Sequence, residues 1–292
     1  MQAYEAAVEP CSENGRAFDF TAADFELVRK LIYRHAGISL SVSKQEMVYS
    51  RLGRRLRALG LPGFKDYLAL LEKGDAAEWE AFTNSLTTNL TAFFREEHHF
   101  PILAELMRHN TRDNAQIALW CSAASTGEEA YSMAITAAET FGTLQPPVRI
   151  VATDIDTNVL AKAKEGIYPM ERLEKMSRER LRRFFLRGSG RHAGEARVRD
   201  ELRALVSFRP LNLLEEEWPI RGPLHAIFCR NVMIYFDKPT QYRILKKFLP
   251  LLRRDGLLFA GHSESFHHAA DLFTPRGKTV YEPANARRPG VA

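Results

Sequence analysis

Two neighbouring stretches decide the fold: IALWCSAASTGEEAYSMAI at residues 117–135 and VRIVATDIDTNVLAKAKEG at residues 148–166. Each starts with a run of apolar residues, passes through a short polar turn and continues with apolar residues at helical spacing. The pattern predicts a buried strand followed by a helix, twice in succession. Later in the chain, similar patterns predict three more strands, at 205–212, 225–231 and 256–264, and a helix over 239–252.

The alternation of strands and helices favours an α/β fold with a doubly wound, mainly parallel sheet. Strands that are apolar along nearly their whole length fit such a sheet, because helices bury both of its faces. The stretch at 169–204 interrupts this alternation with dense charge and with Gly188, Gly190 and Gly194. We expect a helix ending at Arg187, a glycine-containing turn and a short β-hairpin, which together form a small insertion subdomain outside the sheet.

Residues 21–86 predict an all-helical domain. Thr21 and Asp24 are candidate N-caps of its first helix, and Gly37 is the candidate C-cap. Apolar stripes predict further helices at 44–60, 64–71 and 79–86. The expected organisation is a flexible tail at 1–17, a helical domain at 18–86, an α/β domain at 87–285 that includes the insertion at 169–204, and a second tail at 286–292.

The composition is that of a soluble globular protein. The 41 lysines and arginines exceed the 36 aspartates and glutamates by five, and 45% of the residues are hydrophobic, which excludes disordered and fibrous classes. Three cysteines (Cys11, Cys121 and Cys229) cannot form a closed disulfide framework, which favours a reducing compartment. No apolar stretch reaches the roughly 18 residues of a membrane span, and the first residues lack the pattern of a signal peptide. We therefore expect a cytoplasmic protein.

The small net charge hides a strongly basic stretch. Residues 29–65 contain nine lysines and arginines against one acid, Glu46. Such a surface suits an acidic partner: a nucleic acid, a membrane surface or an acidic protein face. An ordinary solvated helix face is the other interpretation, and a basic run taken by itself favours it. Arg51, Arg54 and Arg57 are three residues apart and form a band beside the apolar stripe of their helix.

The chemistry of the α/β domain is expected where its parallel strands end, because ligands bind beyond the carboxyl ends of such strands. Asp154 is positioned there to accept hydrogen bonds from a ribose diol. Glu129 begins the first helix, where its carboxylate would repel a pyrophosphate and could instead meet an ammonium or an adenosine hydroxyl group. The turn SAASTGEE also lacks the glycines of G-x-G-x-x-G. A cationic, phosphate-free adenosine cofactor fits better, and S-adenosylmethionine is the common one. Both acids would also serve as simple helix N-caps.

Four segments together carry a family resemblance: TTNLTAFFREEHHFPIL at 87–103, ASTGEEAYSMAI at 124–135, ATDIDTNVLAKAKEGIY at 152–168 and FCRNVMIYFDKPTQ at 228–241. The chain resembles the CheR family of chemotaxis-receptor glutamate O-methyltransferases from about Phe18 to Tyr281. The resemblance implies a class I methyltransferase-like fold and S-adenosylmethionine as cofactor, with S-adenosylhomocysteine as product. It also implies methylation of glutamate side chains on the cytoplasmic domains of chemoreceptors, which forms methyl esters for sensory adaptation.

The resemblance also assigns site residues. It implies that the segment linking the two domains acts as a lid over the cofactor, and that Arg95 and Tyr235 lie beside the transferred methyl group. We expect Arg95 to steer the acceptor carboxylate and Tyr235 to position it. The cofactor-binding residues that it implies are Asn89, Thr91, Arg95, Glu129, Asp154, Asn212, Leu213, Arg230 and Asn231.

A glutamate acceptor needs little chemical help. Its carboxylate has a reference pKa near 4.3 and is already ionised at neutral pH, so no general base is required. The expected task of the enzyme is to align the reactants and exclude water, and orientation alone supplies roughly 7–11 kcal/mol. The lack of an obvious catalytic dyad in the sequence agrees with this chemistry.

The resemblance also suggests two contacts with receptors. The acidic, glutamate-bearing receptor helices would dock on the basic face formed by Lys44, Arg51, Arg54, Arg55 and Arg57. Some family members hold a receptor's C-terminal peptide on the insertion subdomain, and this chain matches their pattern at Arg187, Gly188, Gly190 and Arg197. The peptide would add a strand at an exposed edge and raise the local concentration of methylation sites.

Two other functions stay open. A nucleic-acid methyltransferase would suit the basic stretch, although base N-methylation usually uses an (Asp/Asn)-Pro-Pro-(Tyr/Phe) turn where this chain has Asn231-Val232-Met233-Ile234. A receptor-binding scaffold without catalysis is the third hypothesis. We predict no metal site: His98 and His99 are adjacent on a helix, where side chains are expected to point apart, and no second pair of ligands accompanies them.

Overall fold

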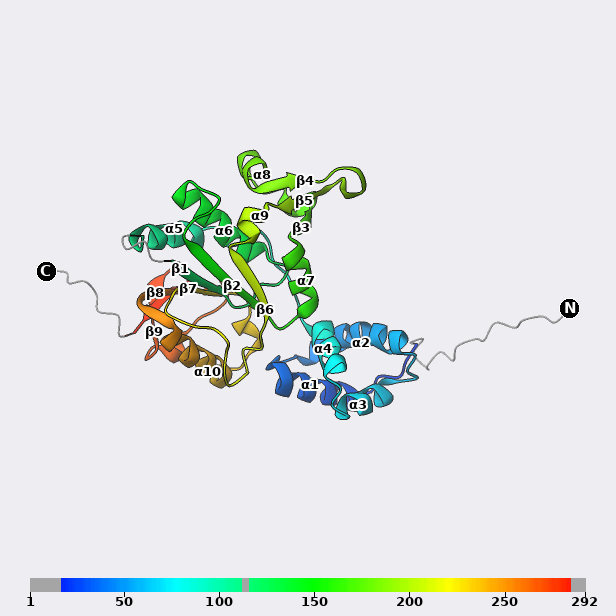
Figure 1. Cartoon of the computed structure of the whole chain (residues 1–292). Coiled ribbons are helices and arrows are strands. Elements are labelled where there is room, and N and C mark those ends of the chain that lie inside the picture. The colour runs from blue at the N-terminus through cyan, green and yellow to red at the C-terminus, as the bar shows by residue number, and fades with distance from the viewer. Residues whose placement is uncertain (1–16, 112–115, 285–292) are drawn as a thin grey trace. The chain divides into compact units, whose positions relative to one another are not determined.

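The computed structural model describes residues 17–111 and 116–284, and these residues form two compact units that divide between Thr87 and Thr88 (Figure 1). The first unit is helical and the second is α/β. Almost all of both predicted tails, together with Cys11, lies outside the described residues. The described helices include none that is long and apolar enough to span a membrane.

The helices of the first unit agree with the sequence prediction. The first begins with a capping box, in which the Thr21 side chain accepts from the Asp24 amide and the Asp24 side chain accepts from the Thr21 amide. It ends at Gly37, whose φ of 70° is easily adopted by glycine. The helices are α1 (Ala22–Ala36), α2 (Gln45–Leu59), α3 (Phe64–Glu72) and α4 (Ala76–Leu86).

The predicted strands of the second unit all form. Within the described residues its main sheet has the strand order β6-β2-β1-β7-β8-β10-β9. The strands are β1 (Ile117–Cys121), β2 (Val148–Asp154), β6 (Val206–Pro210), β7 (Leu224–Cys229), β8 (Leu252–Ala260), β9 (Phe273–Gly277) and β10 (Val280–Pro283). The first five in chain order pair in parallel, so their carboxyl ends share one edge of the sheet. The mainly parallel sheet is therefore confirmed.

Helices cover both faces of this sheet. Figure 1 shows α5 (His99–His109) and α6 (Glu128–Phe141) on one side and α10 (Lys238–Phe248) on the other. Two apolar cores correspond to these faces: Leu103 and Ile135 pack with the first, and Trp120 packs with Phe248 in the second. Alternate residues of a strand face opposite sides, which explains why nearly all of β1 and β7 is apolar and buried. The doubly wound arrangement is also confirmed.

The sheet ends in a C-terminal hairpin that the sequence did not predict. β10 pairs antiparallel with both β8 and β9, and thus lies between them in the sheet. The turn of this hairpin contains Lys278 and Thr279, both with positive φ (54° and 57°). Neither strand has a long apolar run, and each contains a proline, so the hairpin has a weak strand signal.

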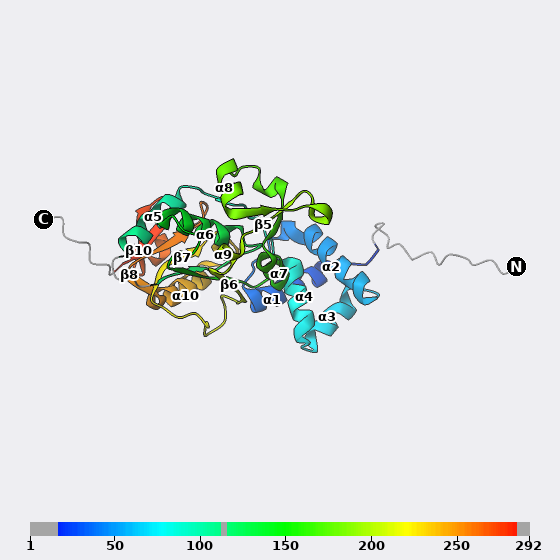
Figure 2. The same ribbon diagram turned by 45° about the horizontal axis from the view of Figure 1, so that its top comes forward.

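The insertion is a small antiparallel sheet with the order β3-β5-β4, separate from the main sheet (Figure 2). Its elements are α7 (Thr157–Glu165) before it, then β3 (Ile167–Pro169), α8 (Arg178–Phe184), β4 (Phe185–Arg187), β5 (Glu195–Val198) and the short α9 (Asp200–Arg203). The expected helix end at Arg187 is wrong: α8 ends at Phe184, because Phe185 to Arg187 adopt extended backbone and pair with β5. The small sheet also begins at Ile167, earlier than the predicted boundary at 169.

Candidate active site

The carboxyl ends of β1, β2 and β7 lie next to one another. Cys121 is level with Ala152 of β2 and with Phe228 of β7. The turn after β1 is fixed by backbone hydrogen bonds to both neighbours, from the Ser122 amide to the Phe228 carbonyl and from the Ala124 amide to the Thr153 carbonyl, each 2.8 Å long. This edge brings Asp154, the start of α6 and the residues after β7 together.

Asp154 is a buried carboxylate held by main-chain amides. Its Oδ2 accepts from the Ser125 amide at 2.7 Å, and its Oδ1 accepts from the Asp156 amide at 3.0 Å. Burial raises the pKa of Asp154 to about 6, although these amides favour the charged form. Each oxygen keeps a second lone pair, which can accept from a ligand hydroxyl group. This geometry suits the ribose role expected from the sequence.

The N-terminus of α6 is surrounded by carboxylates. Glu128 and Glu129 form its first turn and are both buried, with burial raising the pKa of each. Gly127 precedes them with a φ of 96°, and a Cβ there would lie 2.9 Å from both the Ala163 Cβ and the Tyr168 hydroxyl. The site thus offers negative charge where a phosphate-binding helix would offer bare amides. A cofactor with a positive charge and no phosphate fits these residues.

Glu129 and Arg230 form the buried centre of a charge network. Arg230 Nη1 donates to Glu129 Oε2 at 2.8 Å, and Arg230 Nη2 donates to the Arg95 carbonyl. Nη2 also lies 3.4 Å from Glu96 Oε2. Glu129 Oε1 accepts from the Cys121 thiol at 3.2 Å. Arg230 is 4% exposed and its charge is already balanced by two carboxylates.

The segment from Thr88 to His98, expected to cover the cofactor, is tied to the same edge. Asn89 Nδ2 donates to Asp156 Oδ2 at 2.8 Å, and the Ser125 hydroxyl donates to the Asn89 carbonyl at 3.4 Å. The carbonyl of Thr91 accepts from Arg172 at 3.2 Å. Arg95 Nη1 donates to the Leu90 carbonyl at 2.8 Å, while the Arg95 side chain stays partly exposed. The segment has no regular secondary structure, so Asn89 and Thr91 are not helix caps.

The remaining predicted cofactor residues lie on the loops after β6 and β7. The Leu211 amide donates to the Asp154 carbonyl at 2.9 Å, which brings Asn212 and the buried Leu213 to the end of β2. Asn212 Oδ1 accepts from the Leu214 amide. Asn231 has a φ of 57°, and its side chain donates to Glu96 Oε1 at 3.4 Å. Tyr235 ends the short 3₁₀ helix η4 (Met233–Tyr235) and is half-buried.

The predicted docking residues of the helical unit fall into two groups. Arg55 forms an ion pair with the buried Glu78, with Nε donating to Oε1 at 2.8 Å, and Arg51 Nη1 donates to the carbonyls of Ser85 and Thr87. These two arginines hold α2 against α4. By contrast, Lys44, Arg54 and Arg57 are exposed.

The insertion residues are similarly mixed. Arg187 is exposed at the end of β4, whereas Arg197 on β5 forms an ion pair with Asp200 at 2.6 Å. A Cβ on Gly188 would lie 2.0 Å from the His192 carbonyl oxygen, so only glycine fits at this position. Gly190 has a φ of 59° and open space around it. Gly188 is therefore required by the loop itself.

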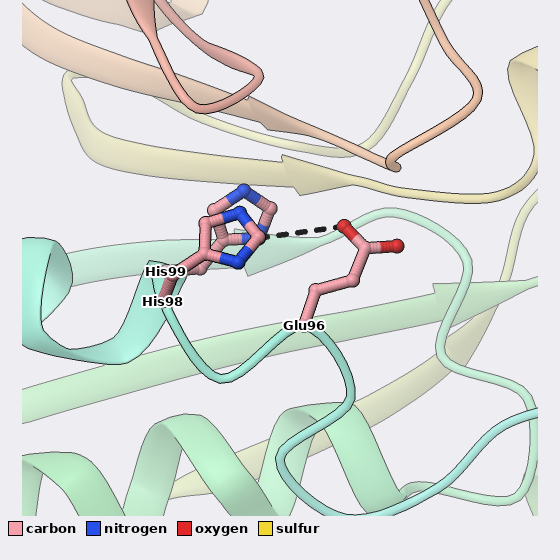
Figure 3. A group of neighbouring side chains, drawn as sticks. All are labelled: Glu96, His98 and His99. Carbon is pink, nitrogen blue, oxygen red and sulfur yellow. Dashed lines mark ion pairs between the residues drawn. The ribbon is translucent and has the colours of Figure 1, made fainter.

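Glu96, His98 and His99 form a group whose potential ligand atoms lie within 4.8 Å of one another (Figure 3). The expectation that the two imidazoles point apart is wrong: their centroids are 4.2 Å apart, because His98 is the N-cap of α5 and not an interior helical residue. His99 Nε2 lies 3.0 Å from the Lys278 carbonyl, to which it must donate. Burial lowers the pKa of His99 to about 4. Arg230 already supplies positive charge beside Glu96, so we assign Glu96 to the Arg230 network.

Two acidic residues that the sequence analysis did not select are central to this edge. Glu96 joins the segment that carries Arg95 to the loops after β7 and β8, because its Oε1 accepts from the Asn231 side chain and from the His262 amide at 3.1 Å. Glu264 is 5% exposed, and its donors among the described residues are main-chain amides. It is the last residue of the strand predicted at 256–264, but β8 ends four residues earlier, at Ala260.

The strand order, the reversed final hairpin and the acidic residues after β1 and β2 define a class I methyltransferase-like protein. Two family models match the chain: "CheR methyltransferase, all-alpha domain" over residues 23–87, and "CheR methyltransferase, SAM binding domain" over residues 89–281. The chain belongs to the CheR methyltransferase family, as the sequence motifs predicted. It is a methyltransferase with a domain for S-adenosylmethionine (SAM).

Similar proteins agree with this assignment. A Pseudomonas aeruginosa protein named chemotaxis protein methyltransferase 2 is 57% identical over 267 residues, which are 91% of this chain and 95% of the relative. The chemotaxis protein methyltransferase of Escherichia coli is 53% identical over 279 residues, covering 93% of this chain and 96% of the relative. A relative of the same name from Klebsiella aerogenes is 57% identical over 260 residues, or 89% of each chain.

Proposed function

We propose that this protein transfers the methyl group of S-adenosylmethionine to glutamate side chains on the cytoplasmic domains of chemoreceptors. The products are glutamate methyl esters, which serve sensory adaptation, and S-adenosylhomocysteine. The carboxylates of Asp154, Glu128 and Glu129 around the β1–α6 turn are the observation that carries the cofactor assignment. The relatives named as chemotaxis methyltransferases support the receptor as substrate.

Each side chain has a defined task in this proposal. Asp154 accepts from the ribose hydroxyls, while Asn212 and Leu213 flank the adenosine at the end of β2. Asn89 and Thr91 close over the cofactor from the linking segment, and Glu129 and Asn231 hold its amino-acid end. The bound cofactor supplies an electrophilic methyl group on a sulfonium.

The transfer itself depends on orientation. Arg95 pairs with the acceptor carboxylate and directs one of its oxygens to the methyl group, and Tyr235 fixes the angle of approach. The acceptor is already an anion near neutral pH, so no side chain has to remove a proton from it. Arg95 is suited to this task because its backbone is anchored by Arg230 while its guanidinium remains partly exposed.

Arg230 acts on the cofactor indirectly in this proposal. Its two Nη atoms are used by Glu129 and the Arg95 carbonyl, and its charge faces Glu96. Arg230 therefore fixes the Glu129 carboxylate, which meets the cofactor, and the Arg95 backbone, which carries the side chain assigned to the acceptor.

The basic face that meets the receptor is narrower than the sequence suggested. We assign docking to Lys44, Arg54 and Arg57, because Arg51 and Arg55 are engaged within the helical unit. Acidic receptor helices would be attracted to this face, which chiefly affects association and weakens with salt.

A receptor tail peptide would bind the insertion by adding a strand along β4. β4 pairs only with β5 among the described strands, and Leu186 and Arg187 are exposed on it. Arg187 and Arg197 would meet the acidic groups of the peptide. Calorimetry with synthetic receptor C-terminal peptides tests this step: Arg197→Glu should abolish binding and leave cofactor affinity unchanged. If no peptide binds the wild-type protein more tightly than about millimolar, the tether does not exist in this protein.

The function is tested with tritiated S-adenosylmethionine and membranes that contain chemoreceptors. Methyl esters release volatile methanol under alkali, so the proposal predicts label that is lost from the receptor band on alkali treatment. Stable label on protein, or label transferred to added DNA or RNA, would contradict it. Calorimetry with the cofactor distinguishes the scaffold hypothesis, which predicts no binding.

A further inference from the structure

Glu264 links the ends of two neighbouring strands through an unusual set of hydrogen bonds. Its Oε1 accepts from the amides of Val232 and Met233 at 3.0 and 2.7 Å. Its Oε2 accepts from the amide of Asn231 at 3.0 Å and from that of Gly261. One carboxylate at the end of β8 thus satisfies three successive amides after β7. An ionised oxygen forms stronger hydrogen bonds than a neutral acceptor, so this contact resists displacement.

The contact requires a close approach that only glycine permits. A Cβ on Gly261 would lie 2.4 Å from Asn231 Nδ2, 2.8 Å from the Asn231 amide nitrogen and 2.8 Å from Glu264 Oε2. Asn231 itself adopts a φ of 57°, which costs free energy in a residue with a side chain. The amides of Asn231 to Met233 therefore converge on Glu264 at some conformational cost.

A second buried side chain holds the other side of the same turn. Gln241 of α10 is 7% exposed, and its Nε2 donates to the carbonyls of Met233 and Phe236 at 2.8 and 3.0 Å. Glu264 binds the amides that lead into η4 and the amide of its first residue, Met233, and Gln241 binds one carbonyl within η4 and one after it. Tyr235, the residue assigned to orient the acceptor, is the last residue of η4 and thus lies in the turn that Glu264 and Gln241 hold.

The two site residues on this loop depend on Glu264 to different extents. The Asn231 side chain is held independently by Glu96 Oε1, so it keeps one tether if Glu264 is lost. Among the described residues, the turn around Tyr235 keeps the bonds from the Tyr235 amide to the Val232 carbonyl and from the Phe236 amide to the Met233 carbonyl, together with those from Gln241. A loss of Glu264 should therefore disturb Tyr235 more than Asn231.

We propose that Glu264 is a positioning residue for methyl transfer, which fixes the Asn231–Tyr235 turn and through it the Tyr235 side chain. The inference rests on the role proposed for Tyr235 at the acceptor. Misplacement of a reacting group by about 1 Å costs about 100-fold in rate. Glu264→Gln keeps the shape of the side chain but places an NH₂ group where amides now donate. It should lower kcat about 100-fold and change cofactor affinity much less.

A double-mutant cycle with Tyr235→Phe separates positioning from simple structural support. If Glu264 acts through Tyr235, Glu264→Gln should cost far less in the Tyr235→Phe background than in the wild type. Fully multiplicative losses in kcat would overturn the proposal, as would a wild-type kcat in Glu264→Gln. The matched control is Glu217→Gln, which removes an exposed loop carboxylate and should leave both kinetic constants unchanged.

Gly261→Ala is the second variant, in case Glu264→Gln does not fold. It retains the carboxylate but forces the Asn231 amide away from it, so the same fall in kcat and the same dependence on Tyr235 are expected. A folded Gly261→Ala protein with wild-type kcat would contradict the inference. Wild-type protein that binds cofactor but labels no receptor glutamate would instead contradict the proposed function, which keeps the two failures distinct.

Discussion

The two sides of the candidate site use carboxylates in opposite ways. At the ends of β1 and β2, Asp154 accepts from the Ser125 and Asp156 amides and has no ion pair among the described residues. Burial raises its pKa to about 6, although these amides favour the charged form. Beside the loops after β7 and β8, Glu96 of the linking segment, Glu129 of α6 and Glu264 are engaged by Arg230 or by main-chain amides. Asp154 on the first side is available to a ligand, whereas the charged residues of the second side hold the loops in place. We call this second group, Arg230 with Glu96, Glu129 and Glu264, the brace. A conspicuous charged residue near the site, such as Arg230, can therefore stabilise the surrounding loops and not bind the ligand itself.

The largest effect on the free energy of unfolding should come from removing Arg230, the cation of the brace. Arg230→Ala leaves the buried Glu129 and the half-buried Glu96 without their cation, and breaking a buried pair in this way costs about 3–5 kcal/mol. We expect urea denaturation to show a loss of unfolding free energy of that order. Asp154→Asn, the matched change on the other side, should cost less than about 1.5 kcal/mol because one acceptor oxygen remains. Equal losses in both variants would remove the distinction between the two sides.

Arg95 takes part in both sides of the site. Its backbone carbonyl accepts from Arg230, and its side chain is assigned to the acceptor carboxylate. Arg95→Ala keeps the carbonyl that accepts from Arg230, so the protein should fold normally. We expect kcat for receptor methylation to fall about 100-fold, as for removal of a group that stabilises the transition state. A wild-type rate in this variant would exclude Arg95 from the reaction.

Asp154, on the side of the site available to a ligand, should make cofactor affinity depend on pH. Asp154 accepts from ribose hydroxyls best when it is ionised, and its pKa before binding is about 6. Affinity should therefore be constant well above pH 6 and should fall as the pH is lowered through that value. Calorimetry with S-adenosylhomocysteine at several pH values measures this dependence.

Removal of the carboxylate is the control for that titration. Asp154→Ala should weaken binding by about 1.5–3 kcal/mol near neutral pH, as expected for hydrogen bonds to a charged acceptor. The fall in affinity between pH 7 and 5 should disappear in this variant. A pH dependence that survives the substitution would assign the titration to another group.

Glu129→Ala tests whether Glu129 contributes mainly to stability, as a member of the brace, or mainly to cofactor affinity. Its oxygens already bind Arg230 and the Cys121 thiol, so part of the effect of Glu129→Ala should appear as lost stability. Asp154→Ala should act mainly on affinity. If Glu129→Ala weakens binding as much as Asp154→Ala does and leaves stability unchanged, Glu129 belongs with Asp154 on the side available to a ligand.

The smallest effect is expected in the helical unit, where the same contrast recurs between engaged and exposed arginines. Arg54→Glu should lower kcat/KM for receptor about tenfold at low salt, with cofactor affinity unchanged and a weaker effect at high salt. Lys73→Glu makes the same charge change at the exposed C-cap residue of α3 and should have little effect. An equal loss in both variants would indicate only a general charge effect.

The fold was largely predictable because its signals are local. The strands β1, β2, β6, β7 and β8 are apolar runs, and the caps at Thr21 and Gly37 are set by adjacent residues. The hairpin β9–β10 was missed because β10 gains stability from pairing with β8, β9 gains it from pairing with β10, and neither has a long apolar run of its own. Likewise, the helix before the Gly188 loop ends early because β5 pairs with Phe185 to Arg187.

The candidate site was predictable only in part. Asp154 follows a strand and is visible in the sequence, but the partners of Glu96 and Glu264 come from loops far away in the chain. No local pattern distinguishes an acid that accepts four amides from an acid on the surface. The same is true of Arg55, whose ion pair with Glu78 depends on how α2 packs against α4.

The central claim is that the acceptor is a glutamate carboxylate of a chemoreceptor. The most direct test is to incubate a purified receptor cytoplasmic domain with this protein and S-adenosylmethionine, and to locate the methyl group by peptide mass spectrometry. The account predicts methyl esters on glutamate side chains with the wild-type protein and at most traces with Arg95→Ala. Methylation of lysine or of another nitrogen, or the same glutamate esters at full yield with Arg95→Ala, would contradict it.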